Sequence, residues 1–149
     1  MHLEIEAAAC TGCRICEAFC SLYHEKVVWP DRARIRVLYQ DDAGPFFPIV
    51  CHQCEDTPCA AACPVEAITV DSRTGAVLVD HEECLFCGDC ARACPFEAVF
   101  LDEDREQTLI CDLCGGEPRC IPACPKDVIA IASGPGPGQT PPSAFGGGE

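Results

Sequence analysis

The stretch CTGCRICEAFC, residues 10–20, contains four cysteines separated by two, two and three residues. Three later stretches repeat this grouping, so that sixteen of the 149 residues are cysteine. Each block ends with two cysteines separated by three residues, and a proline follows that pair in the last three blocks. The blocks are Cys10, Cys13, Cys16 and Cys20; Cys51, Cys54, Cys59 and Cys63; Cys84, Cys87, Cys90 and Cys94; and Cys111, Cys114, Cys120 and Cys124.

The spacing of the first and third blocks is that of bacterial ferredoxins, C-x2-C-x2-C-x3-C. The second and fourth blocks keep the beginning and the end of this pattern, and widen the middle gap with residues 55–58 and 115–119. In bacterial ferredoxins the first three cysteines of a block bind one iron–sulfur cluster, and the fourth binds the neighbouring cluster. Four thiolates per block therefore predict four 4Fe-4S clusters with all sixteen cysteines as ligands.

Disulfides and zinc sites are the competing interpretations of so many cysteines. Disulfides need an oxidising compartment, but Glu4, Glu6 and Arg14 interrupt any apolar run that could act as a secretory signal. Zinc sites favour well-separated cysteine pairs or a mixture of cysteine and histidine. The proline after the closing cysteine belongs to the ferredoxin pattern alone. Clusters are therefore the favoured interpretation, and zinc is the weaker alternative.

Composition and charge reduce the number of possible functions and partners further. With one Trp, two Tyr and one Met, the chain has few large side chains for a core, so metal centres are expected to help hold a single small domain together. The net charge of −14 argues against nucleic acid as a partner and favours a basic protein surface. No run reaches the roughly 18 apolar residues that a membrane span needs. We expect a cytoplasmic protein without a membrane span.

The pattern of apolar residues predicts an α+β fold made of short elements. Strands are expected near residues 3–7 and 34–39, with a helix between them that runs through His24. An apolar run follows each closing cysteine of the later blocks, at residues 65–70, 96–101 and 126–132. The segment AITVDSRTGAVLVD, residues 67–80, predicts a β-hairpin around residues 72–75. Blocks two and three therefore resemble one compact ferredoxin unit that binds two clusters.

Four ordered cysteine blocks over residues 1–132 resemble the four-cluster electron-transfer subunits of the dimethyl sulfoxide reductase and hydrogenase type. This resemblance implies two nested ferredoxin-like units, an outer one of residues 1–50 plus 101–132 and an inserted one of residues 51–100. It also implies that the closing cysteines are exchanged within each unit. The implied ligand sets are Cys10, Cys13, Cys16 and Cys124; Cys111, Cys114, Cys120 and Cys20; Cys51, Cys54, Cys59 and Cys94; and Cys84, Cys87, Cys90 and Cys63.

The short fourth block, CDLCGGEPRCIPACP, indicates which members of this family the chain resembles most. It is more similar to the subunits that accompany carbon monoxide dehydrogenase or tungsten aldehyde oxidoreductases, and the second association is favoured. The resemblance thus implies a hetero-oligomer with a tungsten- or molybdenum-pterin catalytic subunit, and a flavin subunit or a ferredoxin as a further partner. A freely diffusing polyferredoxin, and a subunit of a carbon monoxide dehydrogenase, hydrogenase or formate dehydrogenase complex, are the alternatives.

Other candidate functional residues are few. The sequence contains no phosphate-binding loop and no nucleophile beside a plausible base, so no catalytic residue is predicted and the chain is expected not to be an enzyme. His52 lies between two cysteines, where it is expected to face solvent, with a hydrogen bond to a cluster as the alternative. His2, His24 and His81 have no ligand spacing. Residues 133–149, rich in glycine and proline, predict a flexible tail or an arm that docks on a partner.

Overall fold

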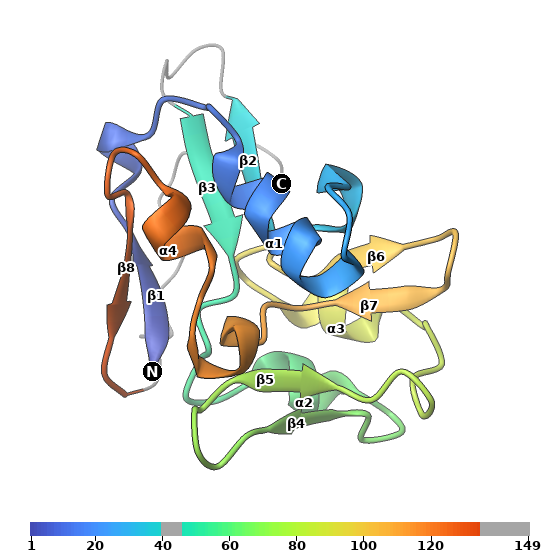
Figure 1. The fold of residues 1–149 in the computed structure, drawn as a ribbon. Coiled ribbons are helices and arrows are strands. Elements are labelled where there is room, and N and C mark those ends of the chain that lie inside the picture. The colour runs from blue at the N-terminus through green and yellow to red at the C-terminus, as the bar shows by residue number, and fades with distance from the viewer. Residues whose placement is uncertain (40–45, 135–149) are drawn as a thin grey trace.

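The computed structural model describes residues 1–39 and 46–134, and within these ranges it is the expected α+β fold of short elements (Figure 1). The predicted tail lies outside the described residues from residue 135 onward. The strands are β1 (His2–Ile5), β2 (Ile35–Tyr39), β3 (Phe46–Val50), β4 (Ile68–Val70), β5 (Val77–Val79), β6 (Phe100–Asp102), β7 (Gln107–Leu109) and β8 (Ile129–Ala132). The helices are α1 (Ile15–Glu25), α2 (Pro58–Ala62), α3 (Asp89–Ala93) and α4 (Cys120–Ala123), and the 3-10 turns are η1 (Ala7–Ala9), η2 (Pro30–Arg32) and η3 (Leu113–Gly116).

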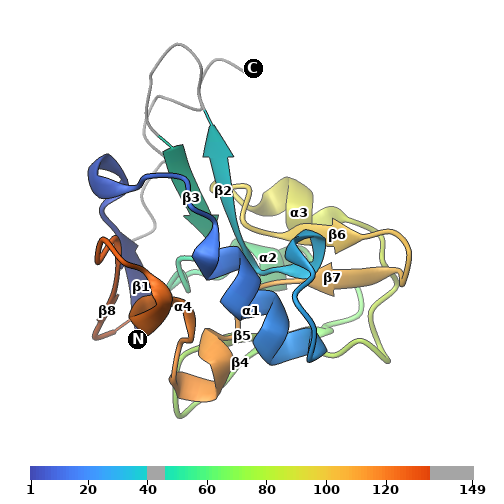
Figure 2. The ribbon, with the colours of Figure 1, turned by 45° about the horizontal axis from the view of Figure 1, so that its top comes forward.

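The strands form antiparallel pairs, β1 with β8, β2 with β3, β4 with β5, and β6 with β7. The β1–β8 pair joins segments that lie more than 120 residues apart in the sequence, with His2 opposite Ala132 and Ile5 opposite Ile129. Figures 1 and 2 both show this pair on one side of the molecule and the β6–β7 pair on the other. The first and the last part of the described chain are therefore built into one structural region.

The hairpin predicted around residues 72–75 is confirmed by the β4–β5 pair, in which Ile68 lies opposite Val79. Its turn is closed by the hydroxyl of Thr74, which donates a hydrogen bond of 2.6 Å to Asp71. Gly75 has a φ of +80°, a backbone conformation that glycine adopts without a steric penalty. The turn thus has a local cause that can be read directly from the sequence.

Helix α1 confirms the predicted helix through His24, and a buried carboxylate fixes its position. Glu17 in its first turn is 3% exposed, pairs with Arg14 at 3.2 Å and accepts a hydrogen bond of 2.6 Å from the backbone N–H of Val37 in β2. An acidic side chain is favourable at this end of a helix because the first N–H groups carry partial positive charge. Lys26, in the left-handed conformation, ends the helix by donating its N–H to the carbonyl of Leu22.

Cysteines make up a large part of the core. Ile35, Leu109 and Leu113 are almost completely buried, and seven cysteines are buried with them: Cys16, Cys20, Cys51, Cys59, Cys90, Cys111 and Cys120. The same cluster of buried side chains extends from Leu3 in β1 to Val128 and Ile129 at β8. The thiols therefore occupy positions that large apolar side chains fill in other small domains.

The helices pack in pairs, α1 against α4 and α2 against α3. Ion pairs connect the segment after α1 to the β6–β7 hairpin, since the Asp102 carboxylate in β6 lies 2.9 Å from Arg32 of η2 and 3.2 Å from Arg105. Arg105 also pairs with Glu25 at the end of α1 at 2.6 Å. The division into an outer and an inserted unit stays a prediction, which these packing partners favour.

Among residues 1–39 and 46–134, no helix is long and apolar enough to cross a membrane.

Asp102→Asn tests the ion pairs between η2 and the β6–β7 hairpin. We expect it to lower the free energy of unfolding by about 1–3 kcal/mol, because it leaves the largely buried guanidinium of Arg32 without its partner. The measurement is anaerobic urea unfolding at neutral pH. Asp104→Asn removes an equal charge from an exposed position two residues away and should leave the midpoint near that of the wild type. Equal effects of the two substitutions would contradict this role of Asp102.

Candidate metal centres

Each cysteine block begins with the same backbone turn. The third residue of every block adopts a left-handed conformation, with φ of +73° at Gly12, +51° at Gln53, +53° at Phe86 and +56° at Leu113. In blocks two and three the backbone N–H of this residue points at the first thiol of its block. The N–H groups of Gln53 and Phe86 lie 3.3 and 3.4 Å from the sulfur atoms of Cys51 and Cys84. Such turns collect N–H groups around an anionic centre.

Each of the last three blocks ends with the same change of direction. Helices α2, α3 and α4 stop at the closing cysteine, which is extended with ψ of 116–117°. The proline that follows is the cause, because its ring excludes the helical conformation of the residue before it. Each closing thiol then accepts an N–H from the residue four positions later, at 3.3–3.4 Å: Ala67 to Cys63, Ala98 to Cys94 and Val128 to Cys124.

Cys20 reaches a similar environment by another route. Ser21 follows it instead of proline, so α1 continues for a further turn to Glu25. The Ser21 hydroxyl is fully buried, donates to the carbonyl of Ala18 and accepts the N–H of Trp29, which folds the chain back after the helix. This return brings the backbone N–H of Arg34 within 3.1 Å of the Cys20 sulfur. A donor from a distant segment thus replaces the local N–H of the other three blocks.

Three cavities are each lined by four cysteines, three from one block and the closing cysteine of another. We call these sets group A, group C and group D. Group A is Cys10, Cys13, Cys16 and Cys124; group C is Cys51, Cys54, Cys59 and Cys94; and group D is Cys84, Cys87, Cys90 and Cys63. The assignment of these thiols as cluster ligands stays a prediction, which this lining favours.

The remaining cysteines, Cys111, Cys114, Cys120 and Cys20, are group B. The thiols of this group raise one another's pKa, which indicates that they lie close together. Burial, and then the nearby thiols of Cys20 and Cys114, raise the pKa of Cys120 to about 12. Burial, together with the thiols of Cys51, Cys120 and Cys20, also raises the pKa of Cys111 well above its usual value.

The thiols fit iron–sulfur clusters because burial makes their anionic form unfavourable without a cation. Burial is the main cause that raises the pKa of Cys16 and Cys51 to about 12 and that of Cys59 and Cys114 to about 11. At neutral pH these thiols would be protonated, whereas iron binds the thiolate. The N–H groups described above stabilise that thiolate. The chain therefore supplies the donor atoms and the hydrogen bonds, and the metal supplies the positive charge.

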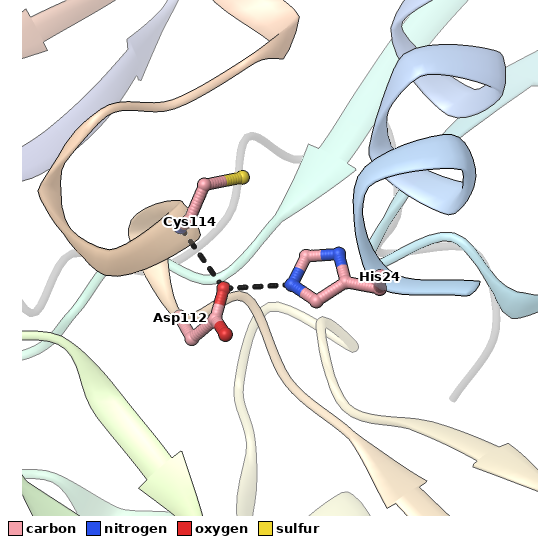
Figure 3. Close-up of side chains that lie close together, drawn as sticks. All are labelled: His24, Asp112 and Cys114. Atoms are coloured by element: carbon pink, nitrogen blue, oxygen red, sulfur yellow. Dashed lines mark hydrogen bonds and ion pairs between the residues drawn. The ribbon is translucent and has the colours of Figure 1, made fainter. Parts of the chain in front are cut away.

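His24 adds a cation beside group B that the cysteine spacing does not predict (Figure 3). Its Nε2 lies 2.9 Å from Asp112, and its Nδ1 lies 2.9 Å from the Cys20 carbonyl and 3.8 Å from the Cys20 sulfur. Burial alone lowers the pKa of His24, but the hydrogen bonds to Asp112 and Cys20 outweigh it and raise the pKa to about 9. Both ring nitrogens face acceptors, so the doubly protonated imidazolium is the form that satisfies the site.

His24, Asp112 and Cys114 offer donor atoms within 4.8 Å of one another, a spacing at which they could hold a metal ion. Asp112 also accepts the N–H of Cys114 at 3.0 Å. Burial alone would raise the pKa of the Asp112 carboxyl, but the hydrogen bond and the charge of His24 outweigh burial and lower this pKa. Because Cys114 belongs to group B, these residues are the surroundings of that group. One signal in the sequence could have indicated them, since His24 follows Cys20 by one helical turn.

The expectation that His52 faces solvent is wrong. Its ring stacks on that of Phe96, with centroids 3.9 Å apart and planes at 10°. Burial, and then the charge of His2, lowers its pKa, so that the neutral form is favoured. Phe96 lies more than 40 residues away, directly after the proline that closes block three, and the sequence gives no local signal for that contact.

The chain matches the family described as "4Fe-4S dicluster domain" over residues 43–133. It is 44% identical over 128 residues to the polyferredoxin-like subunit of aliphatic sulfonate oxidoreductase from Pyrococcus furiosus, which covers 84% of this chain and 73% of that subunit. It is 31% identical over 129 residues to the beta subunit of NADH-dependent phenylglyoxylate dehydrogenase from Aromatoleum evansii, covering 85% of this chain but only 29% of that subunit.

A solved structure is similar as well. The active site complex BamBC of benzoyl coenzyme A reductase, in complex with 1,5-dienoyl-CoA, contains a chain that matches with a TM-score of 0.51 and 28% identity, over 89% of this chain and 78% of that one. The chain therefore belongs to the 4Fe-4S dicluster family. It is a ferredoxin-like protein with multiple 4Fe-4S clusters, of the type that transfers electrons in oxidoreductase complexes.

His24→Leu tests the role of the imidazolium beside group B. Leucine fills the same space but leaves Asp112 without its cation, so we expect group B to lose iron first. Loss of a charged hydrogen bond of this kind costs about 1.5–3 kcal/mol. The measurement is the rate at which visible absorbance bleaches in air, which should rise relative to the wild type. His81→Leu, at an exposed position, is the matched control, and equal bleaching of both variants would contradict the prediction.

Proposed function

We propose that this 4Fe-4S dicluster protein binds four 4Fe-4S clusters, one at each of groups A to D, and carries electrons between a catalytic oxidoreductase subunit and a redox partner. The observation that carries the proposal is the lining of three cavities by three cysteines of one block and the closing cysteine of another. A cluster needs four thiolates, and each cavity offers four. Each cluster supplies reversible one-electron exchange, and the chain supplies spacing, burial and hydrogen bonds.

Features of this chain support the proposed exchange of closing cysteines. Proline directs Cys63, Cys94 and Cys124 away from the helix that carries the preceding cysteine of their block. The packing of α1 against α4 and of α2 against α3 brings each closing cysteine to its partner block. These contacts support the nested arrangement, in which residues 1–50 and 101–132 form one unit and residues 51–100 the other.

The effects of neighbouring thiols on one another support a linear order of the four groups, A, B, C and D. Burial and the other thiols of group B are the largest causes of the raised pKa of Cys120, and Cys16 of group A raises this pKa as well. Cys51 of group C raises that of Cys111 in group B. Cys90 of group D contributes to the raised pKa of Cys59 in group C. Electron tunnelling falls off exponentially with distance, so a row of neighbouring centres is what an electron relay needs.

The two ends of this row are the most accessible. Cys13 of group A and Cys87 of group D are the exposed members of the sixteen cysteines, whereas Cys51 and Cys111 between them are buried. Electrons would therefore enter at one end group and leave at the other. Groups B and C would be insulated from solvent and would exchange electrons only within the chain.

Partners are proposed from the relatives. The Pyrococcus relative is described as a subunit of an oxidoreductase, and the benzoyl coenzyme A reductase chain is part of an active site complex. Both support a non-catalytic subunit in a hetero-oligomer over a freely diffusing polyferredoxin. On the basis of these relatives and of the short fourth block, we favour a tungsten- or molybdenum-pterin aldehyde oxidoreductase as the catalytic partner. The redox partner would be a ferredoxin or a flavin subunit, and the location would be cytoplasmic.

The ligand sets are tested with Cys20→Ser. Wild-type protein prepared without oxygen should contain about sixteen iron atoms and sixteen acid-labile sulfides, four of each per cluster. The substitution removes a ligand from group B, so EPR of the reduced variant should show a change in one cluster, with group A retaining its four thiols. Cys124→Ser, which removes the closing ligand of group A, is the matched control. The exchange would be contradicted if Cys20→Ser altered the cluster held by Cys10, Cys13 and Cys16, or if Cys124→Ser altered the one held by Cys111, Cys114 and Cys120.

The function is tested by separating the chain from its partners. Alone, the chain should exchange electrons with artificial dyes and oxidise no aldehyde, because electron carriage needs clusters and no substrate site. Combined with the catalytic subunit that copurifies with it, it should be required for reduction of ferredoxin. If the partner-free chain oxidised an aldehyde at about 1 per second or faster, a rate typical of enzymes, the proposal would be wrong.

A further inference from the structure

Gln53 is one of the few polar side chains that are almost completely buried, with 2% of its surface exposed. Its amide is nevertheless satisfied on both sides. The side-chain Nε2 donates to the carbonyl of Cys111 at 2.8 Å, and Oε1 accepts the backbone N–H of Val77 at 2.7 Å. Burying an amide is unfavourable unless such bonds are made, so their presence at short distances marks a specific position rather than a chance contact.

The residues that Gln53 connects are far apart in the sequence. Cys111 belongs to block four, 58 positions away, and Val77 lies in β5. Gln53 itself is the left-handed residue of the block-two turn, and its backbone N–H lies 3.3 Å from the Cys51 sulfur. One residue therefore contacts a ligand of group C through its main chain and the backbone of a ligand of group B through its side chain.

This contact lies at the junction of groups B and C. A continuous connection runs from the Cys111 carbonyl, through one hydrogen bond, along the covalent bonds of Gln53, and through a second hydrogen bond to the Cys51 sulfur. The third bond, to β5, holds the amide plane in the orientation that this connection needs.

Gln53 is not required merely to fill space. The equivalent positions of the other blocks are Gly12, Phe86 and Leu113, none of which has a side chain that can donate or accept such a hydrogen bond. A leucine or methionine would fill the volume of Gln53 equally well. The amide is the feature that packing does not explain.

We propose that Gln53 is a positioning residue that fixes the separation of the two middle groups and provides the hydrogen-bonded connection between them. This inference rests on the proposed electron-transfer function. Without the amide, the turn that carries Cys51 and the segment that carries Cys111 lose their direct link. The gap between groups B and C then becomes the slow step for an electron that crosses the chain.

The experiment compares wild type with Gln53→Met, which keeps the length and apolar volume of the side chain but removes both amide bonds. Full-length protein is purified anaerobically and reduced, and EPR measures the magnetic interaction between neighbouring reduced clusters, which weakens steeply with their separation. We expect Gln53→Met to keep the wild-type iron content and to lose part of the broadening that this interaction produces. Internal electron transfer after rapid partial reduction should be slower than in the wild type.

Two further variants separate positioning from general stability. Thr74→Val removes a buried hydroxyl whose hydrogen bonds stay within the β4–β5 turn, so it should destabilise the chain while the EPR broadening remains. Gln53→Glu keeps an acceptor for the Val77 N–H but loses the donor to Cys111, and we expect it to weaken the broadening as Gln53→Met does.

Unchanged broadening and transfer in both Gln53 variants would overturn the inference. Failure of both variants to bind a full set of clusters would overturn it too, because Gln53 would then serve cluster binding in general. If the wild type itself lacked four clusters, or showed no interaction between them, the proposed function would fail instead of the role of Gln53.

Discussion

The burial of cysteine thiols in a chain with few large apolar side chains is the constraint on which this structure depends. Seven cysteines lie in the core beside Ile35, Leu109 and Leu113. Burial is the main cause that raises the pKa of the Cys16, Cys51 and Cys120 thiols, so that the core carries polar groups which do not ionise by themselves at neutral pH. Iron would offset this cost by binding the four thiolates of each proposed group, and folding would thereby be coupled to metal binding. Each N–H that points at a sulfur lowers the remaining cost.

The closing cysteines show how a single covalent feature sets the topology. Three of them are followed by proline, which ends α2, α3 and α4 and turns the thiol toward another block. At Cys20 serine takes the place of proline, and α1 is 11 residues long where the other three helices have four or five. The longer helix extends to His24 and Glu25, whose partners Asp112 and Arg105 lie in the second half of the chain. The exception in the repeat thus provides contacts that the other blocks do not make.

Local patterns predicted much of this structure, and contacts between distant segments account for what they missed. The helix of residues 15–25 and the hairpin around Gly75 follow from the sequence near them, because spacing and turn residues act over a few positions. The roles of Gln53 and His24 depend on segments 58 and 88 positions away, and the stacking of His52 on Phe96 has the same character. Cysteine spacing indicates how many thiols each cluster needs, whereas the residues that surround the thiols depend on how the blocks pack.

Charge is distributed unevenly between the inside and the outside of the molecule. The chain has 24 acidic and only 10 basic residues. Several of the basic residues are engaged in the ion pairs described above, Arg14 with Glu17, and Arg32 and Arg105 with Asp102. These pairs neutralise carboxylates that are buried, and among residues 1–39 and 46–134 most of the exposed carboxylates have no ion-pair partner. Bound thiolate clusters would add further negative charge. A partner that approaches Cys13 or Cys87 therefore meets an acidic field, which favours a basic surface around its own redox centre and steers the two centres together.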